Sequence, residues 1–489
     1  MKADIGLVGL AVMGQNLVLN MNDHGFTVAV NNRSPQAVRD FLAGPAAGRS
    51  TILGAETVEA FVALLERPRK IVLLVKAGQA VDDTIAKLLP HLEAGDLIID
   101  GGNSYWMDSE RRAAELGAKG LRFIGSGVSG GEEGARNGPS LMPGGDPAAW
   151  PLVRDIFTAV SAKTPQGESC CAWMGKGGSG HFVKMVHNGI EYGDMELIAE
   201  TYQLMKGILG LDHAAMAATF EEWNRGELES YLIEITAKIL AVKDADGSPL
   251  VEKILDAAGQ KGTGKWTSQN ALDAGIPLTL VTEAVFARAL SALLDERREA
   301  SKILPGPDET ERRAAGGARP RAELVEDLRH ALLAAKIVSY AQGFMLLRET
   351  SAEKAWNLDF GSIALTWRGG CIIRSAFLGK IKEAFDRKPD LSSLMIDGYF
   401  AKVLADCQGS LRRVVAMTAA AGLPSPALAA ALAFYDGYRA AHLPANLLQA
   451  QRDWFGAHTF ERVDRKRGEF FHHDWIGSGA SAVSGTYNA

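Results

Sequence analysis

A short apolar strand that runs directly into a glycine turn constrains the fold of this chain more than any other segment. Residues 5–8 read IGLV, and Gly9, Ala11 and Gly14 then occupy the three positions of a dinucleotide-binding fingerprint. Residues 16–21 read as a helix whose N-terminus would face a pyrophosphate, because backbone N–H groups are free there. Such a match is weak when it stands alone. Here a second strand follows at residues 27–30, so the segment predicts a nucleotide-binding α/β domain.

The end of that second strand indicates which dinucleotide binds. An NAD site would place Asp or Glu there to accept hydrogen bonds from the ribose hydroxyls. This chain has the sequence NNRS at residues 31–34 instead. A guanidinium pairs with a 2′-phosphate, and such charge-assisted bonds contribute about 1.5–3 kcal/mol each. Arg33 could simply be a surface residue before the next helix, but its position and the missing acid favour NADP as the cofactor.

Three further strands are expected in the first part of the chain, and each ends in a glycine-rich loop. The strands are residues 71–75, 97–99 and 122–124, and the loops that follow are residues 76–78, 100–104 and 125–131. Alternation with helices is typical of a parallel α/β sheet, in which ligands bind beyond the carboxyl ends of the strands. The loops should therefore rim one cleft. We expect residues 139–145 to form another turn-rich segment.

A second informative feature is a polar face on a predicted helix at residues 178–194. Lys184, Asn188 and Glu191 are spaced at i, i+4 and i+7, which is one face, and His187 and Tyr192 flank it. Such a pair of charges is usually a solvated helix face. Here the neighbouring residues are apolar, and buried charged groups are rarely kept without a partner or a task. The pattern predicts a buried polar stripe suited to moving protons on a bound polyol.

Strand signals nearly vanish after residue 177, so a large all-helical domain should follow the Rossmann-type domain. Helical spacing occurs at residues 196–207, 214–224, 229–242, 282–298, 323–347 and 410–421. The charged segment 308–323 contains two glycines and a proline, and we expect it to be an exposed loop. The predicted organisation is residues 1–176 as the nucleotide-binding domain, 177–440 as the helical domain and 441–489 as a C-terminal tail.

Several cationic residues in the helical part could hold an anion. Lys261 and Thr263 alternate with glycines, which gives an ammonium, a hydroxyl and free amides on a tight backbone suited to a phosphate, although this short motif is a poor predictor. Arg288 lies in the apolar run AVFARALSAL, where a buried guanidinium would need a structural carboxylate or an anionic ligand. Arg452 and His458 add a further cation and imidazole near the end of the chain.

Composition narrows the class of protein. The chain has 489 residues, of which 47% are hydrophobic and 22% charged, as in globular proteins with large cores. No apolar run approaches the roughly 20 residues that span a bilayer, and no signal peptide is visible. Four scattered cysteines form neither a disulfide framework nor a metal-ligand pattern. The net charge of −6 argues against nucleic acid as a partner. We expect a cytoplasmic protein that uses no metal and binds no membrane.

The sequence resembles the 6-phosphogluconate dehydrogenase family, of the decarboxylating type, over essentially its whole length. The segments that carry the resemblance include GLAVMGQN (9–16), NNRS (31–34), LVKAG (74–78), DGGNS (100–104), GVSGGEEGAR (127–136), GHFVKMVHNGIEYGDM (180–195), LDAAGQKGTGKW (255–266), FARALSAL (286–293) and QAQRDWFGAHTFER (449–462). The resemblance implies an oxidoreductase of the pentose phosphate pathway that acts in gluconate utilisation. It would convert 6-phosphogluconate and NADP to ribulose 5-phosphate, CO2 and NADPH. It further implies a homodimer in which the helical domain also serves dimerisation and the tail crosses to the partner.

The resemblance also implies a role for each matching residue, with Lys184 as general base and Glu191 as general acid. The positions that match the NADP site are Gly9, Leu10, Ala11, Val12, Met13, Gly14, Asn32, Arg33, Ser34, Val75, Lys76, Ala77 and Asn103. Those that match the site for the sugar acid are Asn103, Ser129, Gly130, Gly131, His187 and Asn188. Those that match the phosphate pocket are Tyr192, Lys261, Thr263, Arg288 and Arg452, with His458 also reaching the substrate. Arg452 and His458 would act in the active site of the other subunit.

Two other functions share part of this pattern. A β-hydroxyacid dehydrogenase that oxidises without decarboxylating would have the same N-terminal part and a helix lysine, but Glu191 and the anion pocket argue against it. A non-catalytic NADP sensor would not need Lys184 and Glu191. The catalytic roles make opposite demands, because the pKa of Lys184 must fall from about 10.4 while that of Glu191 must rise.

Overall fold

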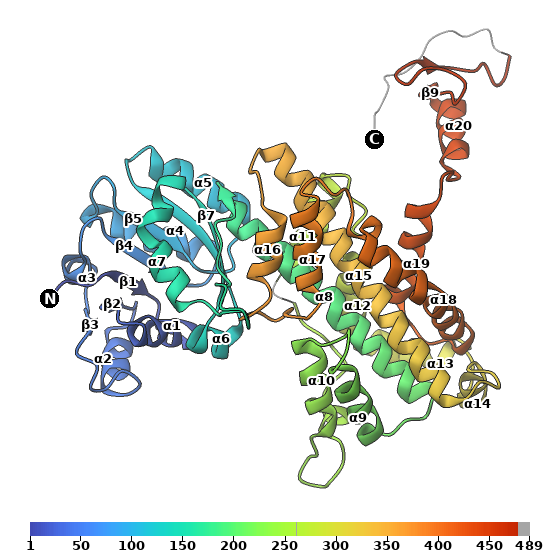
Figure 1. The fold of residues 1–489 in the computed structure, drawn as a ribbon, viewed down its shortest axis with the longest axis horizontal. Coiled ribbons are helices and arrows are strands. Elements are labelled where there is room, and N and C mark those ends of the chain that lie inside the picture. The colour runs from blue at the N-terminus through green and yellow to red at the C-terminus, as the bar shows by residue number, and fades with distance from the viewer. Residues whose placement is uncertain (261, 478–489) are drawn as a thin grey trace. The chain divides into compact units, whose positions relative to one another are not determined.

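The computed structural model describes residues 1–260 and 262–477, and it separates into two compact units, Met1–Leu432 and Ala433–Ala489. An α/β part and a helical part together make up the first unit (Figure 1). The change from one to the other comes just before the long helix that begins at Ser179, close to the boundary expected from the sequence. The limits of the three predicted domains stay predictions.

The α/β part is built on an eight-stranded sheet with the order β3-β2-β1-β4-β5-β6-β7-β8. The strands are β1 (Ile5–Val8), β2 (Val28–Asn31), β3 (Ile52–Gly54), β4 (Lys70–Leu73), β5 (Leu97–Asp100), β6 (Arg122–Ser129), β7 (Ser140–Gly145) and β8 (Gly175–Lys176). Helices α1 (Val12–Asp23), α2 (Pro35–Ala43), α3 (Val58–Leu64), α4 (Gln79–Leu88), α5 (Trp106–Gly117), α6 (Gly131–Asn137) and α7 (Trp150–Val160) connect them, with 3₁₀ turns η1 (Leu89–His91) and η2 (Pro147–Ala149). A Rossmann-type domain is therefore present, as predicted.

Both faces of this sheet are buried, which explains why its strands read as continuous apolar runs. Ile5 and Leu7 of β1 contribute to one apolar core, whereas Val8 contributes to the other. The same alternation separates Val72 of β4 from its neighbour Ile71. Successive side chains of a strand point to opposite faces, so the helices on each side receive one half of every strand.

The sequence analysis was wrong about two glycine-rich segments at the edge next to the helical part. Residues 125–129, expected as a loop, complete strand β6, and residues 140–145, expected as turns, form β7. β7 runs antiparallel to β6, so the sheet is parallel only from β3 to β6 and again between β7 and β8. The glycines serve close packing: a Cβ atom at Gly127 would lie 2.4 Å from Cβ of Lys184, and one at Gly144 would lie 2.3 Å from Oγ of Ser179.

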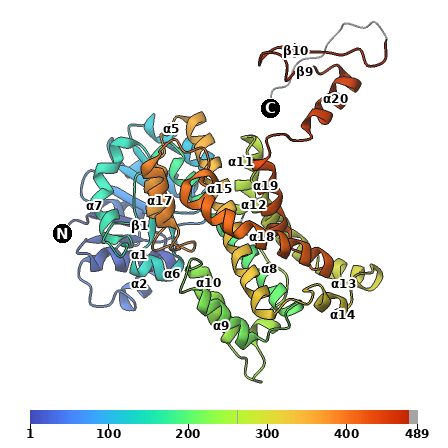
Figure 2. The ribbon, with the colours of Figure 1, turned by 45° about the vertical axis from the view of Figure 1, so that its right-hand side comes forward.

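The second part of the first unit is almost entirely helical. Its helices are α8 (Ser179–Gly207), α9 (His213–Trp223), α10 (Tyr231–Ala241), α11 (Thr263–Asp273), α12 (Thr279–Ala292), α13 (Leu294–Ile303), α14 (Glu309–Ala314), α15 (Arg321–Lys354), α16 (Phe360–Thr366), α17 (Leu378–Arg387) and α18 (Gly398–Ala421), with 3₁₀ turns η3 (Leu250–Lys253) and η4 (Leu394–Ile396). Helix α19 (Pro426–Arg439) begins in the first unit and ends in the second. The long helices α8, α15 and α18 pack side by side as its centre (Figures 1 and 2).

Several helix limits differ from the sequence-based expectation. Residues 196–207 are the second half of α8, and residues 282–298 are divided between α12 and α13 at Leu293. The predicted loop at 308–323 contains α14, which begins with a capping box in which the side chains of Asp308 and Glu311 each accept a backbone N–H. The glycines and the proline lie in the irregular segment 315–320 that follows α14, so the loop prediction is wrong for residues 309–314 and for the start of α15 at Arg321.

Helix α15 is long and apolar enough, by length and composition, to cross a membrane, which the sequence analysis did not anticipate. However, 94% of its apolar window is buried inside the protein, as in the core helix of a globular fold. Lys336 lies fully buried in the middle of that window and pairs with Asp194 of α8, so the helix is suited to a protein interior.

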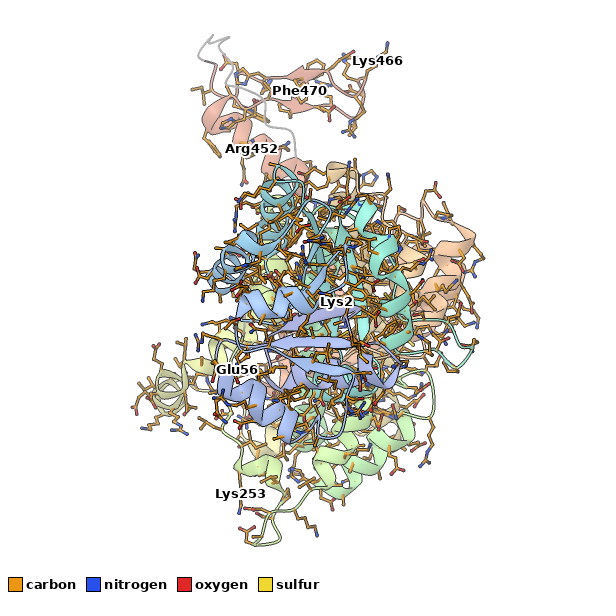
Figure 3. All side chains as sticks on the ribbon, turned by 90° about the vertical axis from the view of Figure 1, so that its left-hand side faces the viewer. Lys2, Glu56, Lys253, Arg452, Lys466 and Phe470 are labelled. Carbon is orange, nitrogen blue, oxygen red and sulfur yellow. The ribbon has the colours of Figure 1, made fainter. Side chains whose placement is uncertain are left out.

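The second unit contains α20 (Ala445–Gly456) and a hairpin of β9 (Phe460–Glu461) and β10 (Phe470–Phe471). Arg452 lies on α20 and Phe470 on the hairpin (Figure 3). The fully buried carboxylate of Asp453 holds this unit together, because it accepts hydrogen bonds from Nδ1 of His472 at 2.9 Å and Nε1 of Trp475 at 2.8 Å. The last part of the predicted C-terminal tail, residues 478–489, lies outside the described residues.

Candidate active site

Helix α8 buries the predicted polar stripe against the end of β6. The side chains of Lys184, His187 and Asn188 are all buried, with His187 fully so. The structure also shows why the helix can lie so close: at Gly125 of β6 a Cβ atom would be 2.7 Å from Nδ1 of His181. Gly125 and Gly127 of β6 have no side chain on the face toward α8, so this helix packs directly on the backbone of the strand.

A chain of hydrogen bonds orients the Lys184 amine. Its Nζ donates to Oγ of Ser129 at 2.9 Å, and that hydroxyl lies 3.4 Å from Nε2 of His187. Nδ1 of His187 is 3.0 Å from Oδ1 of Asn188. All three contacts are satisfied when the Ser129 hydroxyl donates to Nε2 and Nδ1 of His187 carries the proton. In this arrangement Lys184 takes part only as a hydrogen-bond donor to Ser129, and the lone pair of its neutral amine stays available to accept a proton.

Burial moves the pKa values of this face in opposite directions. Burial lowers the pKa of Lys184, because removal from water disfavours the charged amine. The negative charge of Glu191 opposes this shift. Burial raises the pKa of the Glu191 carboxyl. Burial also lowers the pKa of His187 well below its ordinary value, so this ring is neutral. Its 3.9 Å separation from the Glu191 carboxylate is therefore not an ion pair. One helix face thus combines an amine biased toward its base form with a carboxyl biased toward its acid form.

One helix turn after Asn188, Tyr192 of α8 carries a cationic neighbour from another helix. The guanidinium of Arg288, on α12, lies 3.6 Å above the ring of the buried Tyr192. We expected Arg288 to be buried in an apolar helix, but it is half-buried, because its neighbours Phe286 and Leu290 are exposed. Among the residues that the structure describes, no carboxylate lies within ion-pair distance of Arg288. The sequence allowed either a structural carboxylate or an anionic ligand as the partner of Arg288, and these contacts favour the ligand.

The start of α11 packs against the same tyrosine. A Cβ atom at Gly264 would lie 2.5 Å from the Tyr192 ring, and Oγ1 of Thr267 donates to the Met185 carbonyl at 2.8 Å. These contacts fix Thr263, the first residue of α11, close to Tyr192 and Arg288. The structure therefore brings together three of the five predicted phosphate-pocket residues. Lys261 lies outside the described residues.

The glycine turn after β1 forms a cradle that fits a dinucleotide phosphate. A Cβ atom at Gly9 would lie 2.3 Å from the Leu74 carbonyl oxygen, and one at Gly14 would lie 1.8 Å from the oxygen of Gly9. No side chain caps the N-terminus of α1 after Ala11, so Leu10, Ala11, Val12 and Met13 lead into a helix end whose first N–H groups are free for a ligand. The backbone therefore comes as close to a phosphate as the glycines allow.

The residues expected to select the 2′-phosphate lie beside that cradle. Oδ1 of Asn32 accepts a hydrogen bond from the Leu10 N–H at 3.1 Å, which ties the end of β2 to the glycine turn. Arg33 and Ser34 follow on the exposed surface. Within the described part of the chain, the Arg33 guanidinium makes no hydrogen bond or ion pair. It is free to bind an external anion.

The other predicted loops lie at the same edge of the sheet, since β1, β4, β5 and β6 are parallel neighbours. Val75, Lys76 and Ala77 follow β4, Asn103 follows β5, and Gly130 and Gly131 follow β6. Gly130 has a φ of +111°, and a Cβ atom there would lie 2.4 Å from the oxygen of Gly370. Lys76, Asn103 and Gly131 are exposed, as ligand-binding positions need to be.

Sequence reasoning missed one segment of the site. Trp367 packs its ring edge-on to His187 with ring centres 5.6 Å apart, and the nearby Gly370 carbonyl accepts the Ser140 N–H at 2.9 Å. Nothing in the local pattern links residues 367–371 to α8, because the contact joins positions almost 200 residues apart. The sequence WRGG, with an aromatic residue before two glycines, was the only available signal.

Arg452 and His458 belong to the second unit. Both are half-buried there, and Nη1 of Arg452 donates to Oε1 of Gln449 at 2.8 Å. The His458 ring packs edge-on to Phe455 with ring centres 5.9 Å apart. The structure describes these two residues within that unit alone, and their roles stay predictions.

Comparison with known proteins gives matches over nearly the whole chain. The family model described as the NAD binding domain of 6-phosphogluconate dehydrogenase matches residues 4–175, and the model for the C-terminal domain of that enzyme matches residues 180–475. The chain is 58% identical over 488 residues to the decarboxylating 6-phosphogluconate dehydrogenase of Rattus norvegicus and likewise to that of Homo sapiens, with 100% of each chain covered. The solved 6-phosphogluconate dehydrogenase of Plasmodium falciparum, described in apo form and in complexes with NADP+ and with 6-phosphogluconate, is 44% identical with a TM-score of 0.91. That similarity covers 96% of this chain and 100% of the other.

Proposed function

The chain belongs to the 6-phosphogluconate dehydrogenase family, and from this premise we propose how its residues divide the reaction. The protein is an NADP-dependent oxidoreductase that converts 6-phosphogluconate to ribulose 5-phosphate, CO2 and NADPH. The observation that supports the division of roles is the pair of opposite pKa shifts on one face of α8. Oxidation followed by decarboxylation needs one group to remove a proton and another to deliver one.

Lys184 is the general base. Its buried amine, oriented by the Ser129 hydroxyl, accepts the proton of the substrate C3 hydroxyl. When bound, NADP accepts the hydride from C3. The protonated Lys184 then donates a hydrogen bond to the C3 oxygen, which stabilises the negative charge that builds there as CO2 leaves.

Glu191 is the general acid. The enediol that remains after loss of CO2 must be protonated at the carbon that was C2 of the substrate and becomes C1 of ribulose 5-phosphate, and a carboxyl with a raised pKa keeps its proton for this step. Lys184, which gives its proton to the C3 oxygen as CO2 leaves, takes that proton back as the ketone forms. One proton must then pass from Lys184 to Glu191 before the next turnover. Without a protonated Glu191, the chemistry would stop at the enediol.

We assign the remaining predicted residues to binding. Ser129, Gly130, Gly131, Asn103, His187 and Asn188 hold the sugar acid. Tyr192, Lys261, Thr263 and Arg288, with Arg452, bind the phosphate group. The stacking of Arg288 on Tyr192 and the N-terminus of α11 support the phosphate assignment, since they gather positive charge where no carboxylate of the described residues forms an ion pair with Arg288. The glycine cradle, residues 32–34, residues 75–77 and Asn103, which is shared with the sugar-acid site, hold NADP.

One assay tests the proposed reaction against its alternatives. Purified protein is supplied with 6-phosphogluconate and NADP, and CO2 release is measured against NADPH formed. We expect one CO2 for each NADPH. NADPH without CO2 would contradict the decarboxylating step, and complete absence of turnover would favour a cofactor sensor.

Replacing Arg33 by aspartate should reverse much of the cofactor preference. The change removes the cation expected to pair with the 2′-phosphate and adds a carboxylate that repels it. Because each charge-assisted bond is worth about 1.5–3 kcal/mol, the ratio of kcat/KM for NADP to that for NAD should fall by at least about ten-fold. Steady-state rates with both cofactors measure this ratio. Arg39→Asp is the control, because Arg39 is an exposed arginine on the following helix α2 that pairs with Glu56. An unchanged ratio in Arg33→Asp would refute the assignment.

We propose that the protein is a homodimer whose tail completes the active site of the partner subunit. The support is a row of exposed apolar side chains on and after α12 and α13: Phe286, Leu290, Leu293, Ile303 and Leu304. Large exposed apolar side chains that lie near one another in the chain are typical of protein interfaces. The row includes residues directly beside Arg288, so the interface would adjoin the phosphate pocket.

The dimer is tested by placing charges on that row. Phe286→Asp combined with Leu290→Asp should shift the protein from dimer to monomer in sedimentation velocity and lower activity strongly, because Arg452 and His458 would no longer reach a partner. Ile396→Asp, an equally exposed change on η4, should do neither. A double variant that is monomeric yet fully active would contradict tail sharing.

The cytoplasm is the compartment we propose. All four cysteines are buried free thiols, which suits a reducing environment. Fractionation of source cells, with activity followed in each fraction, tests this, and activity confined to a membrane or secreted fraction would contradict it.

A further inference from the structure

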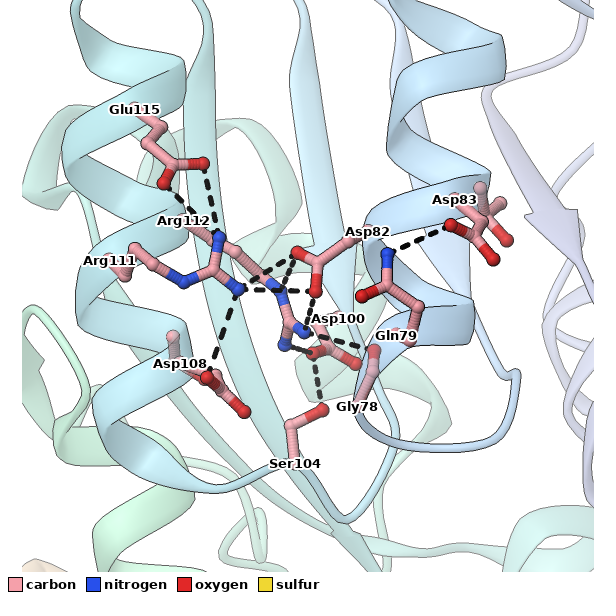
Figure 4. A network of polar contacts seen from close by, with 12 residues as sticks. Gly78, Gln79, Asp82, Asp83, Asp100, Ser104, Asp108, Arg111, Arg112 and Glu115 are labelled. Carbon is pink, nitrogen blue, oxygen red and sulfur yellow. Dashed lines mark hydrogen bonds and ion pairs between the residues drawn. The ribbon is translucent and has the colours of Figure 1, made fainter.

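A buried guanidinium lies beneath two of the cofactor loops and has no part in the proposed chemistry. Arg112 of α5 is only 1% exposed, and Figure 4 shows its side chain joined to Asp82, Asp100 and Gly78. Its Nε and Nη2 atoms donate to the two carboxylate oxygens of Asp82 at 2.8 and 2.9 Å. A third contact joins Nη1 to Oδ2 of Asp100 at 3.2 Å, and a fourth joins Nη2 to the Gly78 carbonyl at 3.1 Å.

These contacts belong to two different loops. Gly78 and Asp82 form the start of α4, directly after the cofactor residues 75–77. Asp100 ends β5 and shapes the following turn, because its carboxylate accepts the Ser104 hydroxyl at 2.6 Å and the Gly102 N–H at 3.1 Å. That turn carries Asn103. Among the residues that the structure describes, Arg112 is the only side chain that bonds to both loops.

The geometry of the guanidinium explains why an arginine stands here. Its rigid, planar fork offers five N–H donors, so one side chain can satisfy a bidentate carboxylate, a second carboxylate and a carbonyl at once. A lysine would keep the positive charge but could not span all three groups from one point. The charge itself matches Asp100, which is fully buried and would be costly to leave unpaired.

The same buried face of α5 also contacts the catalytic helix. Ser109, one turn before Arg112, places its hydroxyl 2.6 Å from Nδ1 of the buried His181 of α8. Helix α5 thus touches the cofactor loops with one residue and the helix of Lys184 and Glu191 with another. The position of the loops is therefore defined relative to the catalytic face.

We propose that Arg112 is a positioning residue for NADP binding, which fixes the separation of the loops at 75–78 and 100–104 without touching the cofactor. The inference rests on the assignment of these loops to NADP in the proposed function. Arg112 should therefore affect the affinity for NADP more than the affinity for 6-phosphogluconate, because most of the residues assigned to 6-phosphogluconate lie on β6, α8, α11 and α12.

The test compares Arg112→Lys with Arg111→Ala. Arg111 is the matched control, because it also bonds to Asp82 but is exposed and contacts neither Gly78 nor Asp100. Isothermal titration of the full-length protein with NADP and, separately, with 6-phosphogluconate gives both dissociation constants. We expect Arg112→Lys to weaken NADP binding at least about ten-fold and 6-phosphogluconate binding less than three-fold. Arg111→Ala should leave both within about two-fold.

The outcomes distinguish this inference from the proposed function. If the parent protein does not bind NADP, the proposed function fails; if the parent binds NADP and Arg112→Lys binds it equally well, the positioning role alone fails. An equal loss for both ligands would also overturn it, since that indicates general unfolding. Should Arg112→Lys fail to fold, Asp82→Ala takes its place: it keeps the pair of Arg112 with Asp100 and should still weaken NADP selectively. Unchanged NADP binding in Asp82→Ala would then count against the proposal.

Discussion

Replacing Lys184 by alanine should lower the rate of hydride transfer by about 10²–10⁴-fold, the usual contribution of a positioned general base. The amine is the buried group that lies within hydrogen-bond distance of Ser129 at the carboxyl end of β6, and burial lowers its pKa. Without it, the C3 hydroxyl must lose its proton to water in a site from which water is excluded. Stopped-flow measurement of NADPH formation in a single turnover isolates this step.

Lys206→Ala is the matched control, because Lys206 lies on the same helix α8 but pairs with Glu252 on the surface. Its rate should equal that of the parent. Glu191→Gln should behave differently from both: NADPH should still form in the first turnover, while ribulose 5-phosphate appears slowly. A Lys184→Ala protein with parental hydride transfer would contradict the base assignment, and a fully active Glu191→Gln protein would contradict the acid assignment.

The directions of the two pKa shifts also set the pH dependence. Activity should fall as pH drops through the lowered pKa of Lys184, because the protonated amine cannot accept a proton. It should fall again as pH rises through the raised pKa of Glu191, because the carboxylate has no proton to give. In Glu191→Gln the loss at high pH should disappear, since glutamine does not titrate.

Replacing Lys336 by methionine should destabilise the first unit by about 3–5 kcal/mol, the effect of removing one partner of a buried ion pair. Nζ of Lys336 lies 2.6 Å from Oδ2 of Asp194, and both side chains are 1% exposed. The other carboxylate oxygen, Oδ1, has no hydrogen-bond partner among the described residues. Loss of the lysine therefore leaves a charge inside the helical core with only Tyr340 beside it.

Chemical denaturation followed by tryptophan fluorescence measures this free energy. The double variant Lys336→Met with Asp194→Leu should recover most of the loss, because no charge stays buried. Lys206→Met, which breaks a surface pair, should cost at most about 1 kcal/mol. Burial already raises the pKa of Asp194, so the deficit in Lys336→Met should shrink as pH falls and the carboxyl becomes neutral. Full stability in the single variant at neutral pH would contradict this account.

The sequence predicted those parts of the fold that depend on local pattern. The strand and glycine turn at Ile5–Gly14 and the helical spacing of Lys184 and Glu191 are read from neighbouring residues, and the structure has both. The glycines of β6 and β7 were misread, because a glycine needed for close packing looks the same as one needed for a turn. Only the position of α8, far along the chain, tells the two apart.

The candidate site was predictable to a similar degree. Spacing places Lys184, Asn188 and Glu191 on one face with His187 beside it, and strand order brings the cofactor loops to one edge. The exposure of Arg288 could not be predicted, because apolar neighbours such as Phe286 indicate burial whether a core or a partner subunit covers them. Nor could the contact of Arg112 with Asp100, since it depends on how two elements of the sheet domain pack rather than on their sequences.

The glycine-lined contact between α8 and the sheet limits how the substrate of this enzyme can be changed by engineering. At Gly125, Gly127 and Gly144 even one added methyl group would collide with the helix, so random libraries should leave these codons untouched. The anion end offers more freedom, because the side chains of Arg288 and Thr263 lie on α12 and α11 rather than on α8. They can be changed while Gly264 and Thr267, which hold α11 against α8, are kept. Selection for unphosphorylated sugar acids should therefore accumulate changes on α11 and α12. The glycine-lined contact should stay unchanged, because it fixes the position of Lys184 relative to the sheet that carries the cofactor loops.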